Sequence, residues 1–82
     1  VPLLVSKAVG EASRVGATRV VLAHNHPSGS TIPSADDLRT TEQLSRALVP
    51  LEIQLLDHLI FCEDEFLSFR ITAYKHYLSK EE

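Results

Sequence analysis

Apolar and polar positions in the first third of the chain predict a helix followed by a short strand. From Leu3 to Val15 the apolar residues recur at helical spacing, at positions 4, 8, 12 and 15. Gly16 then provides a common helix end. Residues 19–24 form an almost continuous apolar run rich in β-branched side chains, which is typical of a strand covered on both faces. We therefore expect a helix over 3–15 and an inner strand over 19–24.

The remaining two thirds predict a loop, a second helix, a hairpin and a closing helix. Turn-forming residues fill 27–33, and a helical pattern begins at Ser34 and ends near Val49. Two apolar runs at 53–61 and 66–71 predict an antiparallel hairpin, and 72–80 predict a short amphipathic helix. The predicted fold class is α/β, with a mixed β-sheet flanked by helices in the order α-β-α-β-β-α.

Length and composition point to one small globular domain. The 82 residues are 44% hydrophobic and 23% charged, so we expect a single domain over residues 1–82. No apolar run approaches the roughly 20 residues that span a bilayer, and the N-terminus lacks a secretory signal pattern. These features predict a soluble, cytoplasmic protein without membrane contact. A lone Cys62 excludes an internal disulfide.

The charge pattern argues against nucleic acid as a direct partner. Residues 1–41 hold four basic and three acidic side chains, and residues 42–82 hold four basic and eight acidic ones, giving +1 and −4 and a total of −3. Nucleic-acid binders usually carry clustered Lys and Arg instead. We therefore expect no direct DNA or RNA binding.

The candidate chemistry lies where the first strand meets the loop, at His24 and His26. Alternate side chains on a strand share a face and lie roughly 6.5–7 Å apart, so both imidazoles can converge on one metal ion. Asp37 can reach the same ion from the first turn of the next helix. Two histidines and a carboxylate leave a fourth tetrahedral position open, which is typical of catalytic zinc sites.

Each part of this pattern also has a purely structural interpretation. Two nearby histidines are more often surface or hydrogen-bonded core residues, and Ser34 with Asp37 forms an N-capping box by itself. Asp57 and His58 interrupt an apolar strand, so they form either a satisfied polar pair in the sheet, which is the favoured reading, or a partner for a metal-bound imidazole. The joint spacing is far more specific than either half.

That joint spacing, His24-x-His26-x7-Ser34-x2-Asp37, matches the JAMM motif of the JAB/MPN/Mov34 metalloprotease superfamily. The wider chain resembles the bacterial RadC family, through residues 24–29, 33–37, 55–60 and 67–70. The resemblance implies an MPN/JAB-like, cytidine-deaminase-like architecture. It implies that His24, His26 and Asp37 ligate Zn²⁺, and that Ser34 stabilises the oxyanion of the tetrahedral intermediate.

This chain departs from the superfamily pattern in one respect, the general-base glutamate. In the superfamily a glutamate on a strand upstream of the first helix is the general base, and this chain begins at Val1, after that strand. We therefore expect the N-terminal part of the domain to be missing. Four glutamates lie on other elements and are assigned no role: Glu11, Glu42, Glu52 and Glu65.

Two functions follow as hypotheses. The first is a zinc-dependent, metallopeptidase-like hydrolase that cleaves an amide or isopeptide bond of a peptide or protein with metal-activated water. The alternative is a non-catalytic MPN-like interaction module in a DNA-repair or other assembly, supported by the absent glutamate. DNA repair rests on the family name alone. An exposed sheet edge beside the zinc site further predicts a homodimer or a strand-swapped pair.

Overall fold

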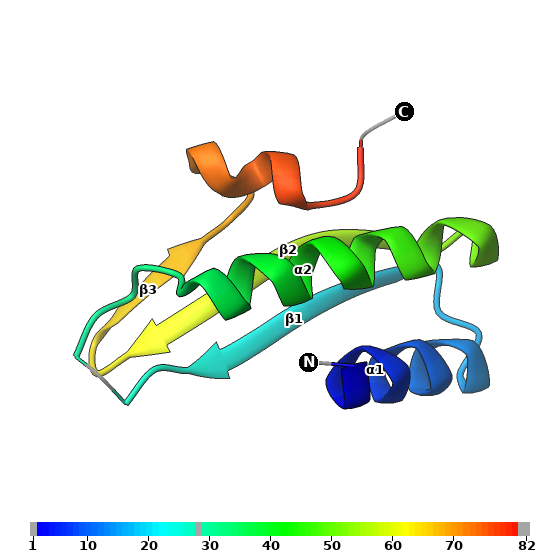
Figure 1. Ribbon diagram of the computed structural model, residues 1–82, viewed down its shortest axis with the longest axis horizontal. Helices are drawn as coiled ribbons and strands as arrows, with labels where there is room; N and C mark the ends of the chain where they lie inside the picture. The colour runs from blue at the N-terminus through cyan, green and yellow to red at the C-terminus, as the bar shows by residue number, and fades with distance from the viewer. Residues whose placement is uncertain (1, 28, 81–82) are drawn as a thin grey trace.

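A computed structural model describes residues 2–27 and 29–80, with side chains from residue 4 onward. Ser28 of the histidine motif and the side chain of Leu3 therefore lie outside the described residues. Two α-helices, three strands and two 3₁₀ helices follow one another along the chain (Figure 1). Their bounds are α1 Pro2–Arg14, β1 Arg19–Asn25, α2 Ala35–Leu48, η1 Val49–Leu51, β2 Gln54–Cys62, β3 Glu65–Ser68 and η2 Ala73–Tyr77.

The three strands form one mixed sheet in the order β1-β2-β3. β1 pairs with β2 in parallel, and β2 pairs with β3 as an antiparallel hairpin, so the predicted α/β class and mixed sheet are confirmed. The prediction of β1 as an inner strand is wrong. Because the hairpin makes β2 the central strand, β1 lies at the edge, and its side chains alternate between exposed and half-buried.

The hydrophobic core lies on one face of the sheet. α2 runs across this face and α1 packs beside it (Figure 1). The largest apolar side chains that are fully buried come from α2, β2 and the segment after β3: Leu44, Leu48, Leu55, Ile60 and Phe69. On the other face no described element covers the sheet, and Val21 and Phe66 are 52% and 60% exposed. Burial on one face only explains why exposure alternates along β1 although residues 20–23 are all apolar.

A bulge in β2 decides which side chains face the helices. The pairing passes from Val20 with Leu55 to Val21 with Asp57, so Leu56 has no partner in β1. Leu55 and His58 would point to opposite faces of a regular strand, yet both are buried. The Leu56 carbonyl instead accepts a hydrogen bond from Arg70 Nε at 2.6 Å.

The C-terminal segment differs from its prediction. The expected amphipathic helix over 72–80 is wrong, because η2 is a 3₁₀ helix of only five residues. Beyond it, Ser79 Oγ accepts from the Leu55 N–H at 2.8 Å and the Ser79 N–H donates to the Leu55 carbonyl at 3.3 Å. These two hydrogen bonds pair Ser79 with β2 instead of continuing a helix. They also satisfy the backbone N–H and carbonyl of Leu55 near the start of β2. Short 3₁₀ turns are common in such connections.

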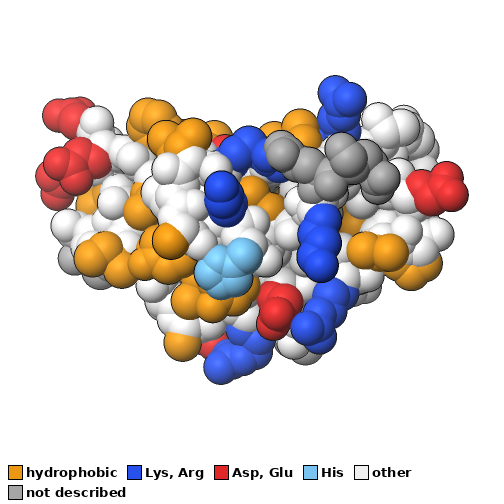
Figure 2. Space-filling model, turned by 90° about the horizontal axis from the view of Figure 1, so that it is seen from above, with side chains coloured by type: hydrophobic (Ala, Val, Ile, Leu, Met, Phe, Trp, Pro, Cys, Tyr) orange, Lys and Arg blue, Asp and Glu red, His pale blue; other side chains and the backbone are white. Residues whose placement is uncertain are grey.

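Charges on the surface are mixed. On the face in Figure 2, acidic side chains lie at both ends and also among the Lys and Arg side chains. In the part of the chain that the structure describes, no helix is long and apolar enough to cross a membrane.

Candidate metal centre

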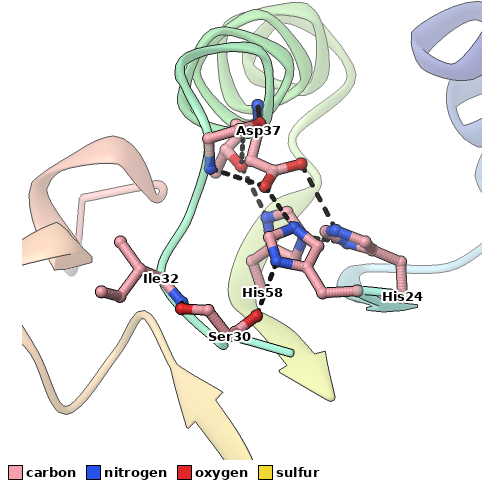
Figure 3. Close-up of polar contacts among 8 residues, drawn as sticks. His24, Ser30, Ile32, Asp37 and His58 are labelled. Carbon is pink, nitrogen blue, oxygen red and sulfur yellow. Dashed lines mark hydrogen bonds and ion pairs between the residues drawn. The ribbon is translucent and has the colours of Figure 1, made fainter. Parts of the chain in front are cut away.

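The side chains of His24 and Asp37 face each other where β1 ends and α2 begins (Figure 3). The side chain of His26 joins them there. The His26 N–H donates to the Phe61 carbonyl at 2.8 Å, which extends the β1 and β2 pairing by one residue. This extension keeps both imidazoles on the same side, with ring centroids 4.9 Å apart. One ligand atom from each of the three residues lies within 4.8 Å of the other two. The structure therefore brings together the three predicted ligands.

The Nε2 atoms of both histidines face the Asp37 carboxylate. His26 Nε2 lies 2.7 Å from Asp37 Oδ2, and His24 Nε2 lies 3.3 Å from Asp37 Oδ1. The second contact lacks hydrogen-bond geometry, so the buried His24 Nε2 has no hydrogen-bond partner among the described residues. A buried nitrogen without a partner is costly unless something else satisfies it.

His26 is oriented by the loop that follows β1. Its Nδ1 lies 3.0 Å from the Ser30 carbonyl, which only accepts, so Nδ1 must carry a proton. Nε2 then either takes a second proton to bind the Asp37 carboxylate or offers a lone pair. Two lone pairs 2.7 Å apart repel each other unless a cation lies between them. Two imidazole nitrogens and a carboxylate are a donor set that suits zinc.

A capping box holds Asp37 in place. The Asp37 N–H donates to Ser34 Oγ at 3.1 Å, and the Ser34 N–H donates to Asp37 Oδ2 at 2.8 Å. The capping interpretation of Ser34 is thus confirmed, and its role at an oxyanion stays a prediction. Burial alone would raise the pKa of Asp37, but hydrogen bonds from the Ser34 backbone, His26 and the Ser34 side chain, with the nearby His24, lower it overall. The carboxylate is therefore ionised, as a metal ligand must be.

The His58 ring contacts His24 directly. Of the two interpretations of the sequence, only the less favoured one, a partner for a metal-bound imidazole, expected this contact. It is 2% exposed, its Nε2 lies 2.9 Å from His24 Nδ1, and its Nδ1 lies 2.7 Å from Thr41 Oγ1. Burial lowers the pKa of His58 to about 4, and charge on His24 adds to this, while Asp37 and Asp57 oppose it. The imidazole is therefore neutral near pH 7.

The structure separates Asp57 from His58. Asp57 accepts hydrogen bonds from Ser68 Oγ at 2.5 Å and from the N–H groups of His58 and Arg70 at 2.7 and 3.0 Å. It is therefore the satisfied polar residue that the favoured interpretation expected. Sequence reasoning missed Thr41 altogether, although it stands one helical turn after Asp37.

The sequence profile of a family described as RadC-like JAB domain matches residues 3–74. The chain belongs to this family. A UPF0758 protein from Cyanothece sp. is 53% identical over 63 residues, which cover 77% of this chain and 26% of the relative. UPF0758 proteins from Bordetella avium and Aquifex aeolicus are 52% and 45% identical over 60 residues each, covering 73% of this chain and 27% and 26% of the relatives. The chain spans about a quarter of the length of these relatives.

In this RadC-like JAB domain a cavity of about 320 Å³ lies beside the three ligands. It is lined by Leu4, Leu22, Ala23, His24, Asp36, Asp37, Thr40 and His58. None of these described lining residues is a glutamate, so the structure places none of the four glutamates considered from the sequence at the site. A larger depression of about 760 Å³ lies between the C-terminal half of α2 and residues 76–80, and none of the three ligands lines it.

Proposed function

We propose that this RadC-like JAB domain binds one Zn²⁺ ion through His24, His26 and Asp37 and serves hydrolysis of an amide or isopeptide bond. The observation that carries the proposal is the cluster of three possible ligand atoms within 4.8 Å, together with the buried His24 Nε2, which has no hydrogen-bond partner among the described residues. Nδ1 of each histidine is already engaged, by Ser30 or His58, so both Nε2 atoms are left for the metal. Such engagement is usual for zinc-bound histidines.

Each residue would have a defined part in the reaction. A bound zinc ion would supply Lewis acidity and lower the pKa of a coordinated water toward 7. The capping box would hold Asp37 in place, and the Ser30 carbonyl would fix the ring of His26. Ser34, at the same helix start, is proposed to donate to the developing oxyanion of the substrate. The substrate would be a peptide or protein.

One observation favours a second function, a non-catalytic interaction module. Amide hydrolysis by this route needs a general base, which typically contributes 10²–10⁴-fold in rate. Among the described residues that line the cavity beside the ligands there is no glutamate. Zinc binding and hydrolysis must therefore be tested separately, and we expect the 82-residue chain to bind zinc with no measurable peptidase activity.

The test of the zinc site is metal analysis after loading and exhaustive dialysis. Wild-type protein should retain about one zinc per chain. His26→Ala should lose most of it, because two remaining ligands hold zinc weakly. His76→Ala is the matched control, since His76 is an exposed histidine on η2, and it should retain zinc like the wild type. Equal zinc content in wild type and a His24→Ala/His26→Ala double variant would refute the site.

A further inference from the structure

Two buried polar side chains, Thr41 and His58, connect the start of α2 to the metal centre. Thr41 Oγ1 lies 2.7 Å from the Asp37 carbonyl and 2.7 Å from His58 Nδ1. His58 Nε2 lies 2.9 Å from His24 Nδ1. Residues 24, 41 and 58 are far apart in the sequence, but α2 and the bulged β2 bring their side chains into one line of hydrogen bonds.

The chemistry of these groups fixes the direction of every hydrogen bond in the line. The Asp37 carbonyl only accepts, so the single hydroxyl proton of Thr41 goes to it. Thr41 Oγ1 must then accept from His58 Nδ1–H. His58 is 2% exposed, and its described ring hydrogen bonds go to Thr41 and His24 rather than to a carboxylate, so burial disfavours a charged ring. With its one proton on Nδ1, the ring accepts from His24 Nδ1–H through Nε2. Nε2 of His24 is thereby left with a lone pair on the side of Asp37.

We propose that Thr41 and His58 are positioning residues for the metal site, which fix His24 as the Nδ1–H tautomer and so present its Nε2 lone pair to a metal ion. The inference rests on the proposed zinc site. Neither residue is a ligand itself. Histidine tautomers are normally set by the partner of the second ring nitrogen, and loss of such a partner typically lowers metal affinity 10–100-fold.

Packing holds this line of groups rigid. Thr41 is fully buried, and the His58 ring stacks on the buried Phe69 with centroids 4.6 Å apart. The Phe69 N–H also donates to the His58 carbonyl at 3.0 Å, which fixes the backbone beneath the ring. The His58 imidazole cannot turn without breaking its stacking on Phe69.

The first experiment compares two substitutions at Thr41. Thr41→Val keeps the side-chain shape but removes the acceptor for His58 Nδ1–H. His58 should then move its proton to Nε2 and donate to His24, which places the His24 proton on Nε2, where the metal binds. We expect zinc affinity, measured by competition with a chromophoric chelator, to fall 10–100-fold. Thr41→Ser keeps the hydroxyl and should bind zinc within about threefold of wild type.

Thermal unfolding of both variants is the control for a general loss of stability. Thr41→Ser removes a buried methyl group and is expected to lower the melting temperature, yet it should retain zinc affinity. A loss of affinity that followed melting temperature across wild type and both variants would overturn the proposal. If Thr41→Val fails to fold, His58→Phe replaces it, because phenylalanine keeps the stacking on Phe69 but cannot accept from His24.

The second experiment reads the tautomers directly in metal-free protein, by ¹⁵N chemical shifts of the histidine rings at about pH 8. We expect the proton of His24 and of His58 on Nδ1 in wild type, and on Nε2 in Thr41→Val. A wild-type His24 protonated on Nε2 would overturn the inference, as would unchanged zinc affinity in Thr41→Val. Absence of zinc binding by wild type would instead refute the proposed function, and the tautomers would still show whether Thr41 and His58 control His24.

Discussion

Ser34 lies where the start of α2 meets the candidate metal centre. Its hydroxyl accepts from the Asp37 N–H, and Asp37 returns a hydrogen bond to the Ser34 N–H while facing both histidines. The helix start and the proposed metal ligand Asp37 are therefore parts of one local structure. The return bond uses the Ser34 backbone, so it does not depend on the hydroxyl.

Replacement of the Ser34 hydroxyl should separate stability from metal binding. We expect Ser34→Ala to lower the free energy of unfolding by about 1 kcal/mol, because a helix cap is lost. Zinc affinity should stay within a few-fold of wild type, since Asp37 keeps the bond from the Ser34 N–H. Denaturant unfolding and chelator competition measure the two quantities. Ser13→Ala, on the exposed surface of α1, is the control and should change neither appreciably; a loss of zinc in Ser34→Ala alone would contradict this division of roles.

For single residues, the sequence predicted the three proposed ligands but not the two residues proposed to orient His24. His24, His26 and Asp37 are joined by one loop, so their spacing alone indicates that they can meet. Thr41 and His58 meet His24 only through pairing of β1 with β2 and through the bulge at Leu56, which reverses the face that His58 occupies. Strand pairing and bulges depend on the whole fold, so spacing could not reveal this contact.

Among the elements, the β2 and β3 hairpin is tighter than its sequence predicts. Four residues were expected between the strands, but Cys62 pairs with Glu65, leaving Glu63 and Asp64 as the turn. Glu63 has φ 55°, while Asp64 is not among the described residues with positive φ. A positive φ at the first central position of a two-residue hairpin turn favours glycine.

The strained turn predicts a stabilising substitution. Glu63→Gly should raise the free energy of unfolding by roughly 0.5–1 kcal/mol, because glycine adopts positive φ without steric cost. Glu63→Ala is the matched control. It removes the same charge but retains the backbone strain, so it should show little gain. Equal stabilisation by both substitutions would show that charge repulsion in the acidic turn, rather than backbone conformation, limits the hairpin.

The C-terminal segment is the element that the sequence pattern predicted least well. Its apolar positions fit a helix, yet Ser79 pairs with Leu55 and η2 ends before it. Arg70 likewise leaves the β3 ladder because its N–H is bound by Asp57. In both cases a polar contact from a distant strand replaces the local pattern, whereas α1 and α2 follow their helical periodicity.

For the whole molecule, the important feature is a sheet that is covered on one side. Within the described residues, one edge of β1 has no partner strand, and Val21, Phe61 and Phe66 are exposed on the open face. An unpaired edge next to exposed apolar side chains is a template for another strand. The helices, by contrast, bury a continuous core around Leu44, Leu48 and Leu55.

We therefore predict that the 82-residue chain self-associates through the free edge of β1. Val21→Lys places a charge on this edge strand at an exposed position, which should weaken association at least about tenfold because edge charges oppose strand pairing. Ile71→Lys is the control, since Ile71 is 80% exposed but lies beyond the end of β3. Sedimentation equilibrium should show dimers for wild type and Ile71→Lys and monomers for Val21→Lys at the same concentration, with circular dichroism confirming that all three are folded. A wild-type protein that stays monomeric at about 1 mM, or equal weakening by both substitutions, would show that the β1 edge is not an association surface.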